Sequence, residues 1–264
     1  NRISLGVQSF DNTDLTLMNR QHDSNQAMEA IHILKTIPIQ NFSVDLIYAI
    51  PGSSAEKLIN NLHRIVDAGV PHVSVYHLTY EDGTIFKYKV KKQRLLEIGE
   101  EESNHQYKII KKYLISNVYK HYEISNFAKD GFISKHNSSY WFGEKYMGLG
   151  PSAHSYNGES RQWNIAALKK YMNGIDQNRP VIEKEILDKN VQYNEFIMVR
   201  LRTMWGINHE ELEKKFGLHA IKRFLQDTDP FIANGYLLRT QNKTVLNPEN
   251  YLLSDYVISQ LFIT

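Results

Sequence analysis

Side chains that could bind a cofactor gather between residues 121 and 155 of this 264-residue chain. The segment holds three histidines, aromatic rings, an amide and a glycine-rich turn, namely His121, His136, Asn137, Tyr140, Trp141, Gly148, Gly150 and His154. An imidazole nitrogen can ligate a metal, aromatic rings can pack on a flat molecule, and a glycine-rich turn can hold an anion. This combination predicts a site for a flat, metal-bearing or anionic ligand.

Each of these residue types also has a structural use. A histidine beside aromatic rings is commonly a hydrogen-bonded structural residue. The Gly148-Leu149-Gly150 turn can equally serve only to supply unusual backbone angles. Residue types alone therefore leave the choice between ligand binding and a structural role open.

Composition and charge exclude several classes of protein. Hydrophobic residues make up 42% of the chain and charged residues 23%, which is ordinary for a soluble globular protein. No apolar run approaches the roughly 20 residues of a membrane span, so we expect no transmembrane segment. The absence of cysteine removes any disulfide framework, which favours the cytoplasm, and excludes cysteine-ligated iron-sulfur clusters within these residues.

A nucleic-acid partner is not expected either. The formal net charge is only +2, and an electrostatic footprint needs clustered cations as well as the right sign. Cations do occur near the C-terminal helices, but they alternate with Glu210, Glu211 and Glu213, as on an ordinary solvated helix surface.

Predicted strands and helices alternate along the first part of the chain, and these elements must position the candidate binding residues. Strands are expected at residues 3–10, 42–50 and 72–78, and capping boxes at Asp23–Gln26 and Ser53–Glu56 begin the helices between them. Short connections between alternating strands and helices indicate a parallel sheet, either doubly wound or part of a β/α barrel. Ligands of such folds lie at the carboxyl ends of the strands.

The rest of the chain divides less regularly. Residues 83–98 read as irregular, 98–117 as a helix, 119–127 as a strand, and 131–158 as mostly loop and short strand. From about residue 190, three helices and two short strands are typical of a winged-helix module. We therefore expect three parts, at residues 1–130, 131–189 and 190–264. Because residues 1–7 read as a strand without an initiator methionine or a leading element, we also expect a fragment of a longer protein.

Three motifs in order resemble one family. They are Arg2-Ile3-Ser4-Leu5-Gly6-Val7-Gln8-Ser9-Phe10, Val44-Asp45-Leu46-Ile47-Tyr48-Ala49-Ile50-Pro51-Gly52, and the segment that ends in His136-Asn137-x-x-Tyr140-Trp141. Together they resemble the radical SAM proteins related to oxygen-independent coproporphyrinogen III oxidase, and specifically the HemW-type haem chaperone branch. The likeness runs almost from end to end. It implies an α/β fold, a partial (second-half) radical SAM β/α barrel with a small, helical, winged-helix-like C-terminal module.

The resemblance also implies cofactors that this chain cannot hold alone. In the family, three cysteines in a C-x-x-x-C-x-x-C loop bind a [4Fe-4S] cluster whose open iron binds S-adenosylmethionine. With no cysteine, the chain offers no ligand for that cluster and should perform no radical chemistry by itself, and we assign no catalytic residue.

Three positions match the family's contacts to S-adenosylmethionine: Gln8, Arg20 and Asp45. A guanidinium suits the carboxylate of that molecule, and a carboxylate and an amide suit its ribose hydroxyls. Composition alone also fits a surface arginine for Arg20 and a turn amide for Gln8. Asp45 is more informative, because an apolar strand rarely carries a lone carboxylate without a purpose.

The pattern of His136, Asn137, Tyr140 and Trp141 resembles the signature of the haem-chaperone branch. His136 is the expected axial ligand of haem iron, with the aromatic rings packing on the macrocycle. His121 and His154 are weaker candidates.

The resemblance implies a haem-binding and haem-delivering chaperone in porphyrin metabolism, with haem or another tetrapyrrole and a haem-accepting protein as partners. The alternative is an enzyme of the oxidase type, which decarboxylates coproporphyrinogen III to protoporphyrinogen IX. The His136-Asn137-x-x-Tyr140-Trp141 pattern favours the chaperone, because the oxidase mechanism does not require it. The residues leave the oligomeric state open.

Overall fold

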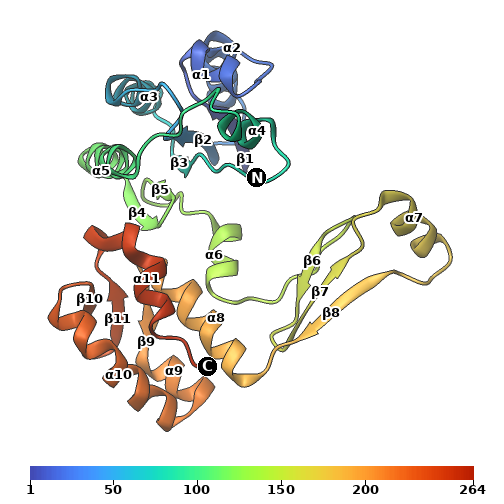
Figure 1. The fold of residues 1–264 in the computed structure, drawn as a ribbon, viewed down its shortest axis with the longest axis vertical. Coiled ribbons are helices and arrows are strands. Elements are labelled where there is room, and N and C mark those ends of the chain that lie inside the picture. The colour runs from blue at the N-terminus through green and yellow to red at the C-terminus, as the bar shows by residue number, and fades with distance from the viewer. The chain divides into compact units, whose positions relative to one another are not determined.

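The computed structural model describes residues 1–264 and divides them into two compact units, residues 1–133 and 134–264 (Figure 1). The expected division at residues 189–190 falls inside the second unit. The three-part organisation as a whole stays a prediction. No helix is long and apolar enough to cross a membrane.

The first unit is built on a five-stranded sheet with the strand order β1-β2-β3-β5-β4. Its strands are β1 (Ile3–Gln8), β2 (Phe42–Tyr48), β3 (His72–His77), β4 (Lys120–Glu123) and β5 (Asn126–Ala128). The first three pair in parallel, as the alternating pattern predicted, and β5 joins β3 antiparallel. The sheet is open in this chain, with β1 at one edge and β4 at the other.

Five helices accompany this sheet. They are α1 (Asn12–Leu17), α2 (Ser24–Thr36), α3 (Ala55–Asp67), α4 (Ile85–Lys91) and α5 (Glu100–Ser116). The capping box of Asp23 and Gln26 is confirmed at the start of α2. The box expected at Ser53 is wrong by one position, because Ser54 Oγ accepts the hydrogen bond from the Lys57 amide. Helix α4 forms within a segment expected to be irregular, since Thr84 caps it in the same way.

One face of the sheet carries the hydrophobic core of this unit. Its buried residues alternate along the strands, as a two-residue period requires, and are Val44, Leu46, Val73, Val75 and Phe127. Helix α5 packs on β2 and on α3, which adds the buried side chains of Leu62 and Ile110. Each such side chain stabilises the fold by about 1.5–3 kcal/mol relative to an exposed one. The opposite face is left for polar residues.

The second unit combines a winged-helix-like bundle with a second antiparallel sheet. The bundle contains α8 (Lys189–Leu201), α9 (His209–Phe216), α10 (Leu218–Ala233), the sheet of β9 (Ile207–Asn208), β10 (Leu237–Arg239) and β11 (Lys243–Leu246), a 3-10 helix (Pro248–Leu253) and α11 (Ser254–Ser259). The other sheet contains β6 (His154–Tyr156), β7 (Ser160–Asn164) and β8 (Ile182–Ile186), with α7 (Leu168–Asp176) between its last two strands.

The segment around His136 is a helix rather than the expected loop. Helix α6 runs over Lys135–Trp141, and Ser134 begins it by accepting a hydrogen bond from the Asn137 amide. The Ser138 side chain then donates to the Ser134 carbonyl at 2.7 Å. The periodicity of a seven-residue helix is too short to be recognised in the sequence, so only the cap could have signalled it.

The core of the first unit predicts a sharp contrast between two positions of α3. Leu62 is fully buried, whereas Ile59 on the same helix is 42% exposed. Leu62→Ala should lower the free energy of unfolding by about 2–5 kcal/mol, because it leaves a cavity. Ile59→Ala should change it by about 0.5 kcal/mol or less. Urea unfolding followed by circular dichroism measures both, and equal losses would contradict the assigned core.

Candidate functional site

A row of polar residues crosses the polar face of the first unit's sheet. The strand register places Gly6 beside Asp45, Asp45 beside Ser74, Ser74 beside Asn126, and Asn126 beside Glu123. Side chains at paired positions of neighbouring strands point to the same face. The lone carboxylate that the sequence singled out therefore belongs to a row that spans the whole sheet.

The three positions expected to contact S-adenosylmethionine lie at or near this row. Asp45 is half-buried and accepts a hydrogen bond from Ser4 Oγ at 3.2 Å. Gln8 ends β1 with a positive φ of 68°, and it pairs with Leu46 of β2 after an irregularity in the register that follows Gly6. Arg20 is exposed in the loop after α1, and His22 Nε2 ties that loop to the Val7 carbonyl at 3.0 Å. The structure thus places all three around the end of β1 without a direct contact between them.

The buried end of the row contains groups to which the sequence assigned no role. Glu123 and Asn126 are 3% and 5% exposed, and Asn126 Nδ2 donates to Glu123 Oε1. The Asn126 Oδ1 atom is buried with no hydrogen-bond partner. An acceptor left unpaired in a buried place costs about 1–3 kcal/mol, so it marks a position where a donor on a ligand would be favoured. The isolated Ser74 between two valines was the available signal in the sequence.

Two histidines of this unit have structural surroundings. His72 Nε2 lies 2.7 Å from the Tyr122 hydroxyl, and burial together with the nearby Arg2 lowers the His72 pKa to about 3. The His121 ring stacks on Phe127 with centroids 4.1 Å apart, and burial lowers its pKa to about 4. A stacked ring with these contacts does not face an open site, so the geometry of His121 favours its structural interpretation.

The residues present do not fit an iron-sulfur cluster. The chain has no cysteine, and no group of three His, Asp or Glu side chains is placed to hold a metal ion. The polar row does suit hydroxyl and amine groups, because it offers carboxylate, amide and hydroxyl oxygens on one surface.

Helix α6 contains the four residues of the motif that begins at His136. His136 and Tyr140 lie on one face of the helix, with His136 Nε2 3.3 Å from the Tyr140 hydroxyl and the rings edge to face at 5.1 Å. Both side chains are exposed. Asn137 and Trp141 lie one position further round the helix and are half-buried. The Trp141 indole nitrogen is buried with no hydrogen-bond partner.

His154 and the glycine turn have other roles. The exposed His154 ring stacks on Trp163 with centroids 5.7 Å apart. A side chain on Gly148 would come within 2.1 Å of the His154 carbonyl oxygen, so glycine permits the close approach of two backbone segments there. Gly150 adopts a φ of +103°, which other residues rarely adopt. The turn therefore has the structural use that the sequence left open.

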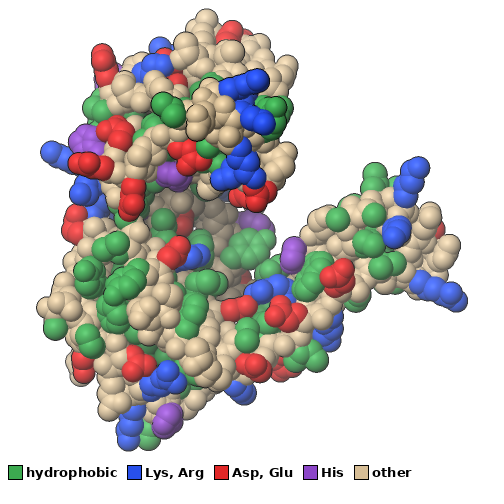
Figure 2. Space-filling view, viewed as in Figure 1, with side chains coloured by type: hydrophobic (Ala, Val, Ile, Leu, Met, Phe, Trp, Pro, Cys, Tyr) green, Lys and Arg blue, Asp and Glu red, His purple; other side chains and the backbone are tan.

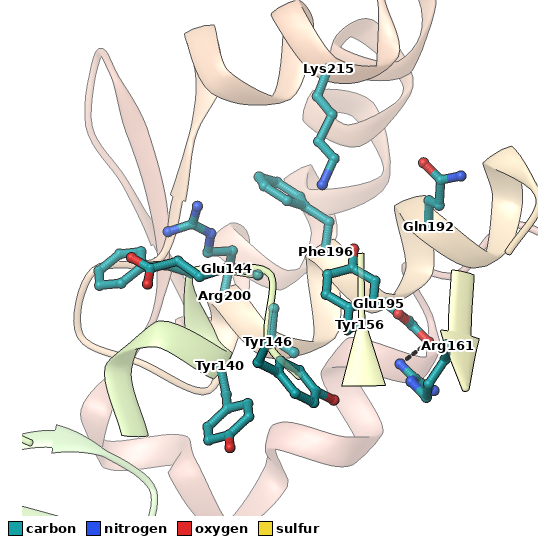
Figure 3. A pocket seen from close by; sticks show the side chains of 13 residues that line it. Tyr140, Glu144, Tyr146, Tyr156, Arg161, Gln192, Glu195, Phe196, Arg200 and Lys215 are labelled. Atoms are coloured by element: carbon teal, nitrogen blue, oxygen red, sulfur yellow. Dashed lines mark hydrogen bonds and ion pairs between the residues drawn. The ribbon is translucent and has the colours of Figure 1, made fainter. Parts of the chain in front are cut away.

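A pocket of about 180 Å³ adjoins helix α6 within the second unit. Figure 3 shows Tyr140 and Tyr146 on one side of this pocket, Lys215 on the other, and Phe196 and Tyr156 between them. On the molecular face in Figure 2, basic and acidic side chains are interspersed rather than gathered by sign. The pocket combines aromatic rings with five charged side chains, which are Glu144, Arg161, Glu195, Arg200 and Lys215.

Comparison with known proteins gives one consistent group of relatives. A family model described as the HemN C-terminal domain matches residues 187–253. Heme chaperone HemW from Lactococcus lactis is 31% identical over 263 residues, which covers 100% of this chain and 69% of that protein. HemW from Bacillus subtilis is 29% identical and covers 97% and 68%. A mitochondrial radical S-adenosyl methionine domain-containing protein from Danio rerio is 29% identical over 81% of this chain and 50% of its own length.

The fold is similar to that of coproporphyrinogen III oxidase HemN from Escherichia coli, which is described as a radical SAM enzyme. The TM-score is 0.81, and the match covers 99% of this chain and 64% of the other. At 19% sequence identity this likeness shows the fold alone. It confirms the α/β fold of radical SAM type that the motifs implied.

The buried histidines predict how the stability of the first unit depends on pH. The unfolded chain protonates histidine near pH 6.5, whereas folded His72 and His121 stay neutral down to about pH 3 and about pH 4. Between about pH 4 and pH 6.5 the unfolded state therefore binds more protons than the folded state. The free energy of unfolding should fall as the pH is lowered through this range. Each histidine contributes up to about 1.4 kcal/mol per pH unit.

Urea midpoints at pH 7 and pH 5 measure this loss. His72→Gln should make the drop in urea midpoint between pH 7 and pH 5 smaller than in wild type, because glutamine does not titrate. His63→Gln, at an exposed position, serves as the control and should leave this drop unchanged. A pH dependence that is identical in both variants would contradict the buried, neutral state of His72.

Proposed function

The chain belongs to the HemW haem chaperone family, and on that premise we propose that it binds haem through helix α6 and delivers it to an acceptor protein. The chain spans 65–69% of the length of the HemW relatives that match it. The activity and partners of the whole protein are therefore part of the proposal. The observation that carries it is the exposed imidazole of His136 held against Tyr140.

His136 has the features of an axial ligand. If its Nε2–H donates to the Tyr140 hydroxyl oxygen, the neutral ring keeps the lone pair of Nδ1, which forms no hydrogen bond in the structure. A neighbour that orients one ring nitrogen while the other binds iron is the usual arrangement of metal-bound histidine. Bound haem would supply the iron and the flat macrocycle that this face recognises.

The neighbouring residues of α6 support the same face. The Tyr140 ring is 41% exposed and packs edge to face on Tyr146, with centroids 4.9 Å apart. Tyr140 therefore presents an apolar surface, and its contact with Tyr146 fixes the position of its ring. Asn137 and Trp141 complete the motif on the adjacent face, where both side chains are half-buried and the indole N–H of Trp141 has no hydrogen-bond partner.

We also propose that Asp45, Gln8 and Arg20 contribute to an S-adenosylmethionine site in the full-length protein. The Asp45 carboxylate lies in a polar row and can accept hydrogen bonds from ribose hydroxyls. The exposed guanidinium of Arg20 suits the carboxylate of the ligand. No residue of this chain fits the [4Fe-4S] cluster, so we derive no radical step from it.

The haem proposal predicts a specific effect of His136→Ala. The full-length protein should show a shifted Soret band on titration with haem, and the variant should lose that shift and bind about 10-fold more weakly or worse, because the axial nitrogen is gone. His154→Ala is the matched control, since His154 is an exposed histidine of the same unit. An unchanged titration of His136→Ala would remove the assignment.

The alternative activity is tested by a separate assay. Full-length protein with a reconstituted cluster is incubated with S-adenosylmethionine and coproporphyrinogen III. We expect no protoporphyrinogen IX, and its formation would favour the oxidase over the chaperone.

The S-adenosylmethionine proposal predicts that Asp45→Asn weakens binding of that ligand about 10-fold, because a charged acceptor is replaced by a neutral amide. Equilibrium dialysis of S-adenosylmethionine with the full-length protein measures the affinity. Asp67→Asn, at an exposed position of α3, serves as the control. Equal affinities in the two variants would show that Asp45 makes no such contact.

A further inference from the structure

We propose that the aromatic pocket beside α6 receives a carboxylate arm of the porphyrin, with Lys215 as the group that binds it. The proposal rests on the haem-binding function above and extends it from the iron ligand to the edge of the macrocycle. It concerns a pocket that contains Tyr140 but not His136. The two contacts can therefore be tested separately.

The cations of the pocket differ in how they are paired. Arg161 forms an ion pair with Glu195 at 2.7 Å, and Arg200 is paired with Glu211. Lys215 forms no ion pair, and its ammonium lies over the rings of Phe196 and Phe216 at 5.3 and 5.5 Å. Among the basic side chains that line the pocket, Lys215 is thus the one still able to bind an anion directly.

The cations that lie over the aromatic rings favour an anionic over a cationic ligand. Arg200 covers Phe142 at 4.8 Å and Phe196 at 5.3 Å, so the faces of these rings already hold cations of the chain. A further cation would be repelled by Arg200 and Lys215. The Lys215 side chain is exposed, so its ammonium is accessible to a ligand carboxylate. Desolvation lowers the Lys215 pKa, while the nearby Glu211 carboxylate acts in the opposite direction. Of the two carboxylates that line the pocket, Glu195 is paired with Arg161, and Glu144 is exposed to solvent, which screens its charge.

The size of the pocket fits a substituent rather than a whole macrocycle. Its volume is about 180 Å³, whereas sites that enclose a complete small molecule usually have about 300–1,000 Å³. Tyr140 lines the pocket and also contacts His136 on the exposed face of α6. A macrocycle held at that face reaches the pocket only by extending one propionate past Tyr140, among the rings of Tyr146 and Tyr156 that line it.

The test compares porphyrins with free and esterified carboxylates. Metal-free protoporphyrin IX and its dimethyl ester are titrated into the full-length protein, because neither needs an iron ligand. Wild type should bind the free acid about 10-fold more tightly than the ester, since only the acid forms a charge-assisted hydrogen bond. Lys215→Met should remove this preference. Lys214→Met, at the exposed neighbouring position on α9, should keep it.

Each outcome bears on one of the two proposals. If Lys215→Met keeps the preference, or if wild type does not distinguish acid from ester, the pocket assignment is overturned and haem binding through His136 stands. His136→Ala should keep the acid preference for the metal-free porphyrin while losing the haem Soret shift. Loss of that preference in His136→Ala would show that the two contacts are not separate and would overturn the pocket assignment. Matching circular dichroism spectra confirm that Lys215→Met is folded.

Discussion

The in-register parallel pairing of β1, β2 and β3 is the constraint on which the first unit depends. It places apolar side chains such as Val44 and Val73 on one face and polar ones such as Asp45 and Ser74 on the other. A shift of one residue would move Asp45 into the apolar core and the valines into the polar row. The same register that stabilises the core therefore builds the polar surface, and neither can change alone.

In the second unit, the residues proposed to bind haem lie on a short helix. A helix of seven residues is marginal in water, so α6 depends on its Ser134 cap and on packing against α8. Phe142, which follows the last residue of the helix, packs on Trp205 with ring centroids 4.9 Å apart and on the Arg200 guanidinium. Rigid support behind an exposed imidazole holds that imidazole ready for a ligand.

Local pattern revealed much of this arrangement, and long-range pairing accounts for the rest. The alternation of strands and helices predicted the parallel sheet. The lone carboxylate in an apolar strand indicated that Asp45 has a purpose other than core packing. The row from Asp45 to Glu123 could not be foreseen, since it depends on which strand follows β3 in the sheet. Similarly, nothing near Lys215 in the sequence indicates that it shares a pocket with Tyr140, which lies 75 positions earlier in the chain.

The division into two units separates two kinds of chemistry. All groups suited to haem, from His136 to Lys215, lie in residues 134–264, and all those suited to S-adenosylmethionine lie in residues 1–133. The proposed axial ligand, His136, and the Tyr140 hydroxyl beside it come from one helix, so the geometry of this pair does not depend on a cluster or on any residue of the sheet. A scaffold arranged in this way can bind a tetrapyrrole without carrying out radical chemistry on it, which is what transfer of an unchanged haem requires.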